Sequence, residues 1–200
     1  MLFLDELPEF DRRVLEVLRE PLESGQIVIA RARDKVSFPA RFQLVAAMNP
    51  CPCGFLGDPS GRCRCSPEQI QRYRGKLSGP LLDRIDLHIT VARESTALSP
   101  PQDSGESSAT AAARVATARD IQLRRQGIAN AFLDLPGLRE HCVLNDIDRD
   151  WLEHACERLT LSLRSAHRVL KVARTLADLQ SETAISRQHL AEALQYRTNL

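Results

Sequence analysis

The sequence predicts an α/β region that is followed by an all-helical region. Three observations predict this order. Short apolar runs of strand length alternate with helical segments over residues 1–93, which is typical of an α/β fold. Residues 94–110 are rich in Ser and Pro and poor in apolar side chains, as in a flexible linker. Over residues 111–200, apolar residues recur at helical spacing.

The first region is expected to contain five strands. Residues 1–4 and 42–48 are apolar runs of the length of a buried strand. Residues 26–30 and 35–38 predict the two strands of a hairpin, and residues 87–91 alternate like a further strand.

Helices are predicted on both sides of the hairpin. Three apolar residues lie at helical spacing on one face after the first strand: Phe10, Val14 and Leu18. Pro21 is expected to close or kink that helix. Ser66 and Pro67 predict the N-cap and first residue of a polar helix that reaches Leu77.

The second region is expected to be helical throughout. Four helices are predicted, over residues 112–126, 150–159 and 163–179 and from Ser186 onward. The third carries two apolar stripes, so it should be largely buried. Ile185 and Leu190 are spaced to form a hydrophobic staple around the start of the last helix.

The composition is that of an ordinary globular protein. Apolar residues make up 43% of the 200 residues and charged residues 26%. The formal net charge of +1 gives no overall attraction to nucleic acid, so such a contact needs a local basic patch. The apolar run at residues 1–4 meets acidic residues at once, unlike a signal peptide, so a cytoplasmic location is expected. Six cysteines in that compartment should be reduced or bound to metal.

Polar residues follow two of the predicted buried strands. Asp5 and Glu6 end the first, and Asn49 ends the run 42–48. Strand ends in open α/β sheets face the ligand crevice. There an Asp can hold the hydration shell of Mg²⁺, a Glu can polarise an attacking water, and an amide can orient that water. The alternatives are an acidic strand end at the surface and an Asn-Pro turn.

Four cysteines form two C-x-C pairs within one loop that is rich in Gly and Pro: Cys51, Cys53, Cys63 and Cys65. Four thiolates this close suit tetrahedral Zn²⁺. Unligated thiols and disulfides formed by oxidation are the alternatives. Cys142 and Cys156 lie among apolar residues and are expected to be core cysteines.

Linked motifs resemble those of AAA+ ATPases. The Walker B strand is matched by LFLDELPEF, the sensor 1 strand by AAMNP, the arginine-finger segment by GPLLDRIDL and the sensor 2 helix by SLRSAHRVLKVARTLADL. Their order resembles the branch that contains magnesium chelatase subunits and MCM helicases. The CPCG…CRC insert is similar to the bacterial ComM/YifB group, which is associated with natural transformation. The resemblance covers essentially the whole chain and implies a partial AAA+ core with a hairpin insert, followed by an all-α lid.

The resemblance also implies roles for single residues. Asp5 would be the acid associated with Mg²⁺, Glu6 the base that polarises water, and Asn49 sensor 1. Arg84 would be the arginine finger, acting in the site of a neighbouring subunit.

Two arginines of the lid match the sensor 2 position. Arg164 is the better candidate, and Arg168 lies one turn further along the same face. The alternative for both is a surface position on a helix. For Arg84 the alternative is pairing with Asp83 or Asp86 alone.

The implied function is that of a ring-forming motor, hexameric and driven by ATP and Mg²⁺. In related helicases the hairpin reaches DNA, so its basic tip, Arg31, Arg33 and Lys35, would follow a phosphate backbone. A solvated turn is the alternative. A second basic stretch comprises Arg72, Arg74 and Lys76. Branch migration of recombination intermediates is the implied role. The rivals are a magnesium chelatase-type subunit that remodels a protein and a zinc-stabilised binding module without turnover.

The phosphate loop of the family is not among the 200 residues. The G-x-x-x-x-G-K-[ST] motif should precede Walker B, where this sequence begins. The chain is therefore expected to be a truncated protein or a fragment, also without the family's Lon-protease-like domain. Without that loop it is expected to be inactive by itself.

Overall fold

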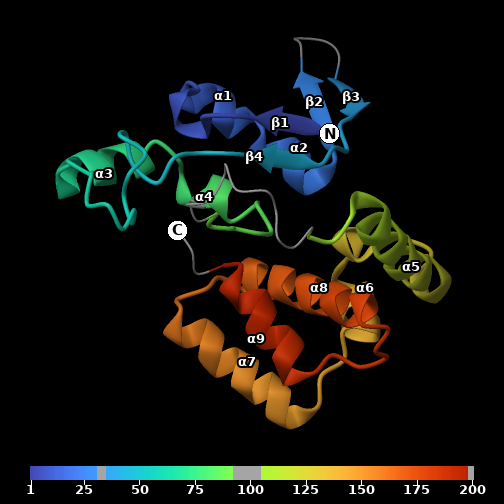
Figure 1. The fold of residues 1–200 in the computed structure, drawn as a ribbon. Helices are drawn as coiled ribbons and strands as arrows, with labels where there is room; N and C mark the ends of the chain where they lie inside the picture. The colour runs from blue at the N-terminus through green and yellow to red at the C-terminus, as the bar shows by residue number, and fades with distance from the viewer. Residues whose placement is uncertain (31–34, 92–104, 198–200) are drawn as a thin grey trace. The chain divides into compact units, whose positions relative to one another are not determined.

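The fold is that of a computed structural model, which describes residues 1–30, 35–91 and 105–197 (Figure 1). The chain forms two compact units, one over Met1–Ile85 and one over Asp86–Leu200. We call them the α/β unit and the helical unit and describe each by itself.

The α/β unit contains two small sheets. β1 (Leu2–Leu4) pairs in parallel with β4 (Leu44–Ala46), and Leu2 lies opposite Leu44. β2 (Gln26–Ala30) and β3 (Lys35–Pro39) form an antiparallel hairpin. The four strands expected before residue 50 are therefore confirmed.

The helical segment after β1 is broken into three pieces: a 3-10 turn over Leu7–Glu9, α1 (Arg12–Val17) and α2 (Arg19–Ser24). The three apolar residues at helical spacing do not share one buried face, although Leu18 packs partly buried against the core. Phe10 precedes α1 and is 39% exposed, and Val14 is 56% exposed, whereas Leu15 is 1% exposed. The helix starts later than its apolar spacing suggested, because Asp11 caps it by accepting the backbone N–H of Arg13 at 2.7 Å.

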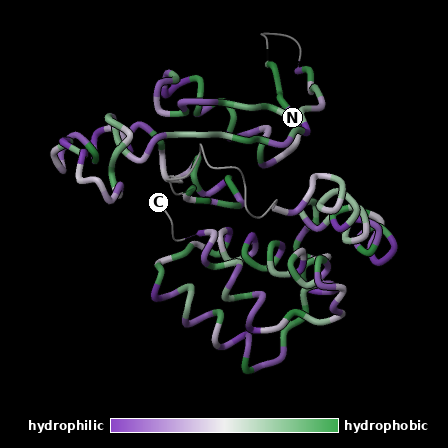
Figure 2. Tube along the Cα trace, viewed as in Figure 1, coloured by the Kyte–Doolittle hydropathy of each residue, from purple (hydrophilic) through white to green (hydrophobic). Residues whose placement is uncertain are grey.

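One small core holds the α/β unit together. Four buried leucines form it: Leu7, Leu15, Leu77 and Leu81. They come from the turn after β1, from α1 and from the segment around α4 (Gly79–Leu82), which follows α3 (Pro67–Arg74). Apolar side chains of both sheets stay exposed, including Phe3 at 57% and Phe38 at 49%. Figure 2 shows these strands as apolar segments.

The strand predicted at residues 87–91 is not formed. These residues have no regular structure, and Ile89 and Val91 are 67% and 88% exposed. Alternation alone does not make a strand, which needs a partner for its backbone groups. Here the backbone N–H of His88 donates to the carbonyl of Tyr196 at 2.8 Å, and no described strand pairs with the segment.

The helical unit consists of five α-helices among its described residues: α5 (Ser108–Gln126), α6 (Leu135–His141), α7 (Asp146–Arg158), α8 (Leu163–Leu179) and α9 (Arg187–Gln195). The four predicted helices are confirmed, although α5 begins within the segment expected to be linker. α6 was not predicted. Leu163 is 74% exposed, so α8 buries its face only further along, at Val169 and Ala173.

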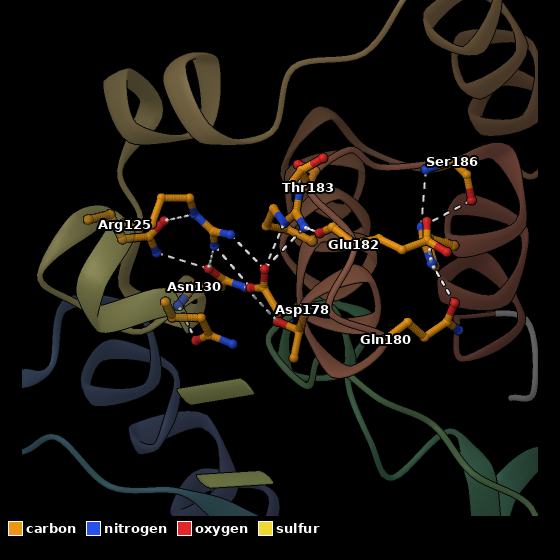
Figure 3. Close-up of polar contacts among 12 residues, drawn as sticks. Arg125, Asn130, Asp178, Gln180, Glu182, Thr183 and Ser186 are labelled. Atoms are coloured by element: carbon orange, nitrogen blue, oxygen red, sulfur yellow. Dashed lines mark hydrogen bonds and ion pairs between the residues drawn. The ribbon is translucent and has the colours of Figure 1, made fainter. Parts of the chain in front are cut away.

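A buried polar network ties α5 to α8 (Figure 3). Asp178, whose side chain is 0% exposed, accepts hydrogen bonds from three side chains: Arg125, Asn130 and Arg174. The Arg125 and Asn130 contacts are 2.6 and 2.8 Å long. Arg174 also donates to two backbone carbonyls after α8, those of Thr183 and Glu182. Burial acts to raise the pKa of Asp178, but hydrogen bonds from Arg125 and Asn130 outweigh it and the pKa is lowered.

None of the described helices combines the length and the apolar character needed to cross a membrane.

Candidate functional site

The candidate nucleotide residues lie at one edge of the β1–β4 pair. The strands are parallel, so their carboxyl ends share an edge, with Asp5 and Glu6 after β1 and Asn49 after β4. Backbone pairing continues just beyond the strands, because Leu7 donates to the carbonyl of Ala47 at 2.9 Å. The structure therefore brings together the two polar strand ends that the sequence singled out.

Glu6 stands where the chain turns away from β1. Its φ and ψ angles of 52° and 45° are left-handed, and its N–H donates to Oδ1 of Asp5 at 2.9 Å. A non-glycine residue costs energy in this conformation, and such residues gather at functional sites. All three candidate side chains are exposed at the edge. Carboxylate and amide oxygens there fit the hydration shell of Mg²⁺ bound to a nucleotide.

Sequence reasoning did not predict that α3 packs against the chain just after β4. Nε of Arg74 donates to the carbonyl of Pro50 at 3.3 Å. Tyr73 is 8% exposed. Burial raises the pKa of Tyr73, a hydrogen bond with the Asn49 backbone opposes this, and the charge of Glu6 adds to the rise. An aromatic residue in an otherwise polar helix was the available signal.

Arg84 is held within the α/β unit, just after α4. Its Nη1 donates to the carbonyl of Pro80 at 2.6 Å, and its Nη2 pairs with Oε2 of Glu23 at 2.5 Å. Its side chain is 9% exposed. Glu23, on α2, is an acidic partner that sequence reasoning did not name.

The two sensor 2 candidates lie on the first two turns of α8 in the helical unit. Arg164 is exposed. Arg168 is paired with Asp86, and its side chain is 15% exposed. This contact makes Arg164 the more accessible of the two.

The basic hairpin tip is described only in part. Arg31 and Arg33 lie outside the described residues, and Lys35 is an exposed residue at the start of β3. In the second basic stretch, Nζ of Lys76 pairs with Oε1 of Glu9 at 3.1 Å. This contact and the bond from Arg74 to Pro50 show that part of the stretch serves internal packing.

The four loop cysteines meet in one cluster. The Sγ atoms of Cys51, Cys53, Cys63 and Cys65 all lie within 4.8 Å of one another. Three of the separations are 3.4, 3.7 and 3.8 Å. These are too long for disulfides, and four ligands at about 2.3 Å in a tetrahedron would lie about 3.8 Å apart. The cluster therefore fits a tetrahedral metal ion.

The electrostatics of the cluster point the same way. A backbone hydrogen bond at Phe55 lowers the pKa of Cys53 to about 6, while a hydrogen bond with Cys53 raises the pKa of Cys65 to about 12. A thiolate at Cys53 thus disfavours a second thiolate at Cys65, and a bound cation would offset that repulsion. Cys142 behaves differently, since burial among apolar side chains raises its pKa to about 11. It is a core cysteine, as predicted.

Comparisons with known proteins were made on the whole chain. The model for magnesium chelatase, subunit ChlI, matches residues 1–98, and the model for the C-terminal part of that subunit matches residues 105–197. The chain is 53% identical to competence protein ComM of Haemophilus influenzae over 198 residues, which are 98% of the chain and 38% of ComM. It is 52% identical to the uncharacterized protein YifB of Escherichia coli over 98% of the chain and 39% of YifB. An uncharacterized Mycobacterium tuberculosis protein is 42% identical over the same shares.

The chain thus spans about two fifths of the length of these relatives. Both family models and these relatives lead to one assignment: the chain belongs to the magnesium chelatase ChlI-like family of AAA+ ATPases, with homologues in ComM and YifB.

Proposed function

We propose that this chain is the carboxy-terminal portion of a ring-forming, ATP-driven motor that acts on DNA. The observation that carries the proposal is the shared edge of β1 and β4, with Asp5, Glu6 and Asn49 at the ends of two paired parallel strands. In an AAA+ site these positions serve the Mg²⁺ ion, the attacking water and the γ-phosphate. The exposed apolar faces of both sheets fit a core that is completed by other parts of a longer protein.

The proposed chemistry is hydrolysis of a bound nucleoside triphosphate. Bound MgATP supplies the electrophilic γ-phosphoryl group. Asp5 orients water around the metal, Glu6 accepts hydrogen bonds from the attacking water and polarises it, and Asn49 fixes the direction of that water. Left-handed backbone at Glu6 sets its carboxylate at the turn rather than along a strand.

Two arginines complete the site in this proposal. Arg84 acts on the nucleotide of a neighbouring subunit, where a guanidinium contributes about 10³–10⁵ in rate in related NTPases. Arg164 acts as sensor 2 because it matches that position of the lid helix and is exposed at the start of α8. Homo-oligomerisation into a ring, hexameric by resemblance, follows from the role of Arg84.

DNA is the proposed substrate of movement. The basic hairpin tip of Arg31, Arg33 and Lys35 suits contacts to phosphates that do not depend on base sequence. The relative in Haemophilus influenzae is called a competence protein, which fits a role in natural transformation or recombination. Branch migration is the proposed activity that accounts for both the basic hairpin tip and the likeness to a competence protein.

The test uses the full-length ATPase. Glu6→Gln should leave ATP binding intact and stop turnover, because the amide keeps its shape but cannot polarise water. Glu20→Gln, an exposed glutamate on α2, is the matched control and should keep full turnover. Near-normal ATPase of the Glu6 variant would remove that residue from catalysis.

DNA separates the rival functions in the same assay. A motor on DNA should be stimulated by DNA, and the three substitutions Arg31→Ala, Arg33→Ala and Lys35→Ala together should abolish that stimulation. A protein-remodelling chelatase subunit should not respond to DNA. We expect ATP binding to depend on a phosphate loop outside these 200 residues. If the 200-residue chain by itself bound ATP with micromolar affinity, that dependence would be contradicted and a different nucleotide site would be favoured.

We further propose that the cysteine cluster holds a structural Zn²⁺. Four thiolates leave no open position for water, so the metal would order the loop rather than catalyse. The loop has few apolar side chains to bury, and its Phe55 ring faces Arg62, with the guanidinium 4.4 Å from the ring centre. A metal supplies the stabilisation that such a loop cannot obtain from a core.

A further inference from the structure

The guanidinium of Arg84 is enclosed by its own subunit. One terminal nitrogen donates to the Pro80 carbonyl and the other pairs with Glu23, at 2.6 and 2.5 Å. The whole side chain is 9% exposed. A guanidinium buried to this degree presents almost no surface to a phosphate carried by another molecule.

The backbone around Arg84 is fixed as well. Ser78 caps α4 by accepting the N–H of Leu81 at 3.2 Å, and its hydroxyl donates to Glu16 on α1. Leu81 is 1% exposed and packs in the same cluster as Leu15 of α1. The start of α4 is thus anchored to α1, and the contact between Arg84 and Glu23 joins its end to α2. The long side chain of Arg84 is the part of this segment that can change position without unpacking the core.

We propose that Glu23 is a positioning residue that keeps Arg84 docked until the triphosphate of a neighbouring subunit draws it away. The proposal rests on the role in trans given to Arg84 above. A guanidinium fork fits a carboxylate and a phosphate in the same way, so one partner can replace the other. A triphosphate carries more negative charge than one carboxylate, and it can therefore compete for the cation.

This exchange links the finger to the state of the neighbouring site. When that site holds no triphosphate, Arg84 returns to Glu23 and its charge is neutralised. When a triphosphate is present, it competes with the Glu23 carboxylate for the guanidinium, and Arg84 is released in a fraction of the subunits. The docked state lowers turnover by the fraction of subunits in which Arg84 is held back.

The decisive variant is Glu23→Gln in the full-length ATPase, because the amide has the same shape but no charge. If about one finger in ten is undocked in the wild type, kcat should rise by up to about tenfold. The KM for ATP should not rise, because ATP contacts in cis are unchanged and release of Arg84 from Glu23 favours binding of the neighbouring triphosphate. Glu20→Gln is the matched control: it lies on the same helix, its side chain is exposed, and kcat should not change.

The variant Arg84→Ala distinguishes a failure of the docking proposal from a failure of the proposed function. Arg84→Ala should abolish turnover, and the double variant Glu23→Gln/Arg84→Ala should be equally inactive, since the proposed effect of Glu23 on turnover requires Arg84. If Arg84→Ala keeps its turnover, the role in trans is wrong. If Arg84→Ala is inactive while Glu23→Gln has unchanged or lower kcat, the docking proposal is overturned.

A folding defect would not leave the question open. Thermal unfolding should place the melting temperature of Glu23→Gln close to that of the wild type. Should that variant unfold, Glu23→Asp is used in its place, because its shorter side chain keeps the charge and draws it back from Arg84. An increase in kcat for Glu23→Asp supports the proposal, and an unchanged or reduced kcat overturns it.

Discussion

The α/β unit and the helical unit differ in how each is held together. Among the residues that the structure describes, eleven buried side chains form one continuous core in the helical unit, whereas four buried leucines form the core of the α/β unit. The α/β unit leaves apolar strand faces exposed and adds a cysteine cluster, while the helical unit adds the enclosed polar network around Asp178. Four of the candidate site residues, Asp5, Glu6, Asn49 and Arg84, therefore lie in the unit with the smaller core, whereas Arg164 lies in the helical unit.

The largest effect is expected from the metal. A structural zinc site contributes on the order of 10 kcal/mol, and residues 51–66 have little else to order them. Chelation should therefore increase hydrogen exchange across residues 51–66 and at Asn49, which directly precedes the loop. Exchange in α8 and α9 should stay unchanged. Mass spectrometry of exchanged peptides measures both regions in one experiment.

Substitution of cysteines supplies the control for that experiment. Cys51→Ser should lose the metal and reproduce the effect of chelation, because Cys51 is 0% exposed and central to the cluster. Cys156→Ser, in the helical unit, should retain one zinc per chain. Protein purified under reducing conditions with no zinc and four freely titrating thiols would remove the site.

The next effect is in the helical unit. Asp178→Ala should cost about 3–5 kcal/mol in the free energy of unfolding, because it leaves Arg174, with 3% of its side chain exposed, without its buried carboxylate. Urea unfolding followed by circular dichroism measures this. Asp146→Ala is the control, since the Asp146 side chain is 90% exposed and its pair with Arg149 is worth under about 1 kcal/mol.

The same aspartate predicts that the helical unit loses stability in acid. Its pKa is lowered in the folded state, so its stabilising contribution is complete above the unfolded value of about 3.9. That contribution is lost as the pH falls through the folded pKa. The difference in stability between wild type and Asp178→Ala should therefore shrink below about pH 4. If wild type and Asp178→Ala differed in stability by the same amount at pH 7 and at strongly acidic pH, the charge of Asp178 would be excluded as the source of that difference.

Two matched leucines compare the cores directly. Leu15 is 1% exposed and Leu190 is 0% exposed, so Leu→Ala removes the same buried atoms in each unit. Such substitutions cost about 2–5 kcal/mol, and the cost rises with the cavity that remains. Leu190→Ala should lie near the upper end, because its core is continuous. Leu15→Ala should lie near the lower end, where the small cluster can collapse. Equal losses would mean that the two cores are equally rigid.

Residues that carry local signals could be read from the sequence, and residues defined by distant contacts could not. The four strands before residue 50, the cysteine spacing and the N-cap at Ser66 follow from patterns a few residues long, and the structure has all of them. The partner of Arg84 is different, because Glu23 lies 61 positions away and one glutamate among many carries no signal. The expected strand at 87–91 failed for the same reason, since alternation does not specify a partner strand.

The smallest effect is expected at the starts of two helices, α3 and α9, both of which were predicted. Ser66 begins α3 with a capping box: Gln69 donates its N–H to Oγ of Ser66 at 3.3 Å, and the N–H of Ser66 donates to Oε1 of Gln69 at 2.9 Å. At α9 the N–H of Ser186 donates to Nδ1 of His189, which is 1% exposed and also contacts Gln180. Loss of an N-cap serine costs about 0.5–2 kcal/mol.

Ser66→Ala should cost more than Ser186→Ala in local stability. The Ser66 hydroxyl accepts the N–H of its helix's third residue at 3.3 Å, while at α9 the buried ring of His189 also holds the backbone N–H of Ser186. The α9 start is also packed on both sides, with Ile185 at 5% and Leu190 at 0% exposure, whereas α3 follows directly after the cysteine loop. Hydrogen exchange at the first turn of each helix is the measurement. Faster exchange in α9 than in α3 would show that the hydroxyl of Ser186, and not the surrounding core, sets the start of that helix.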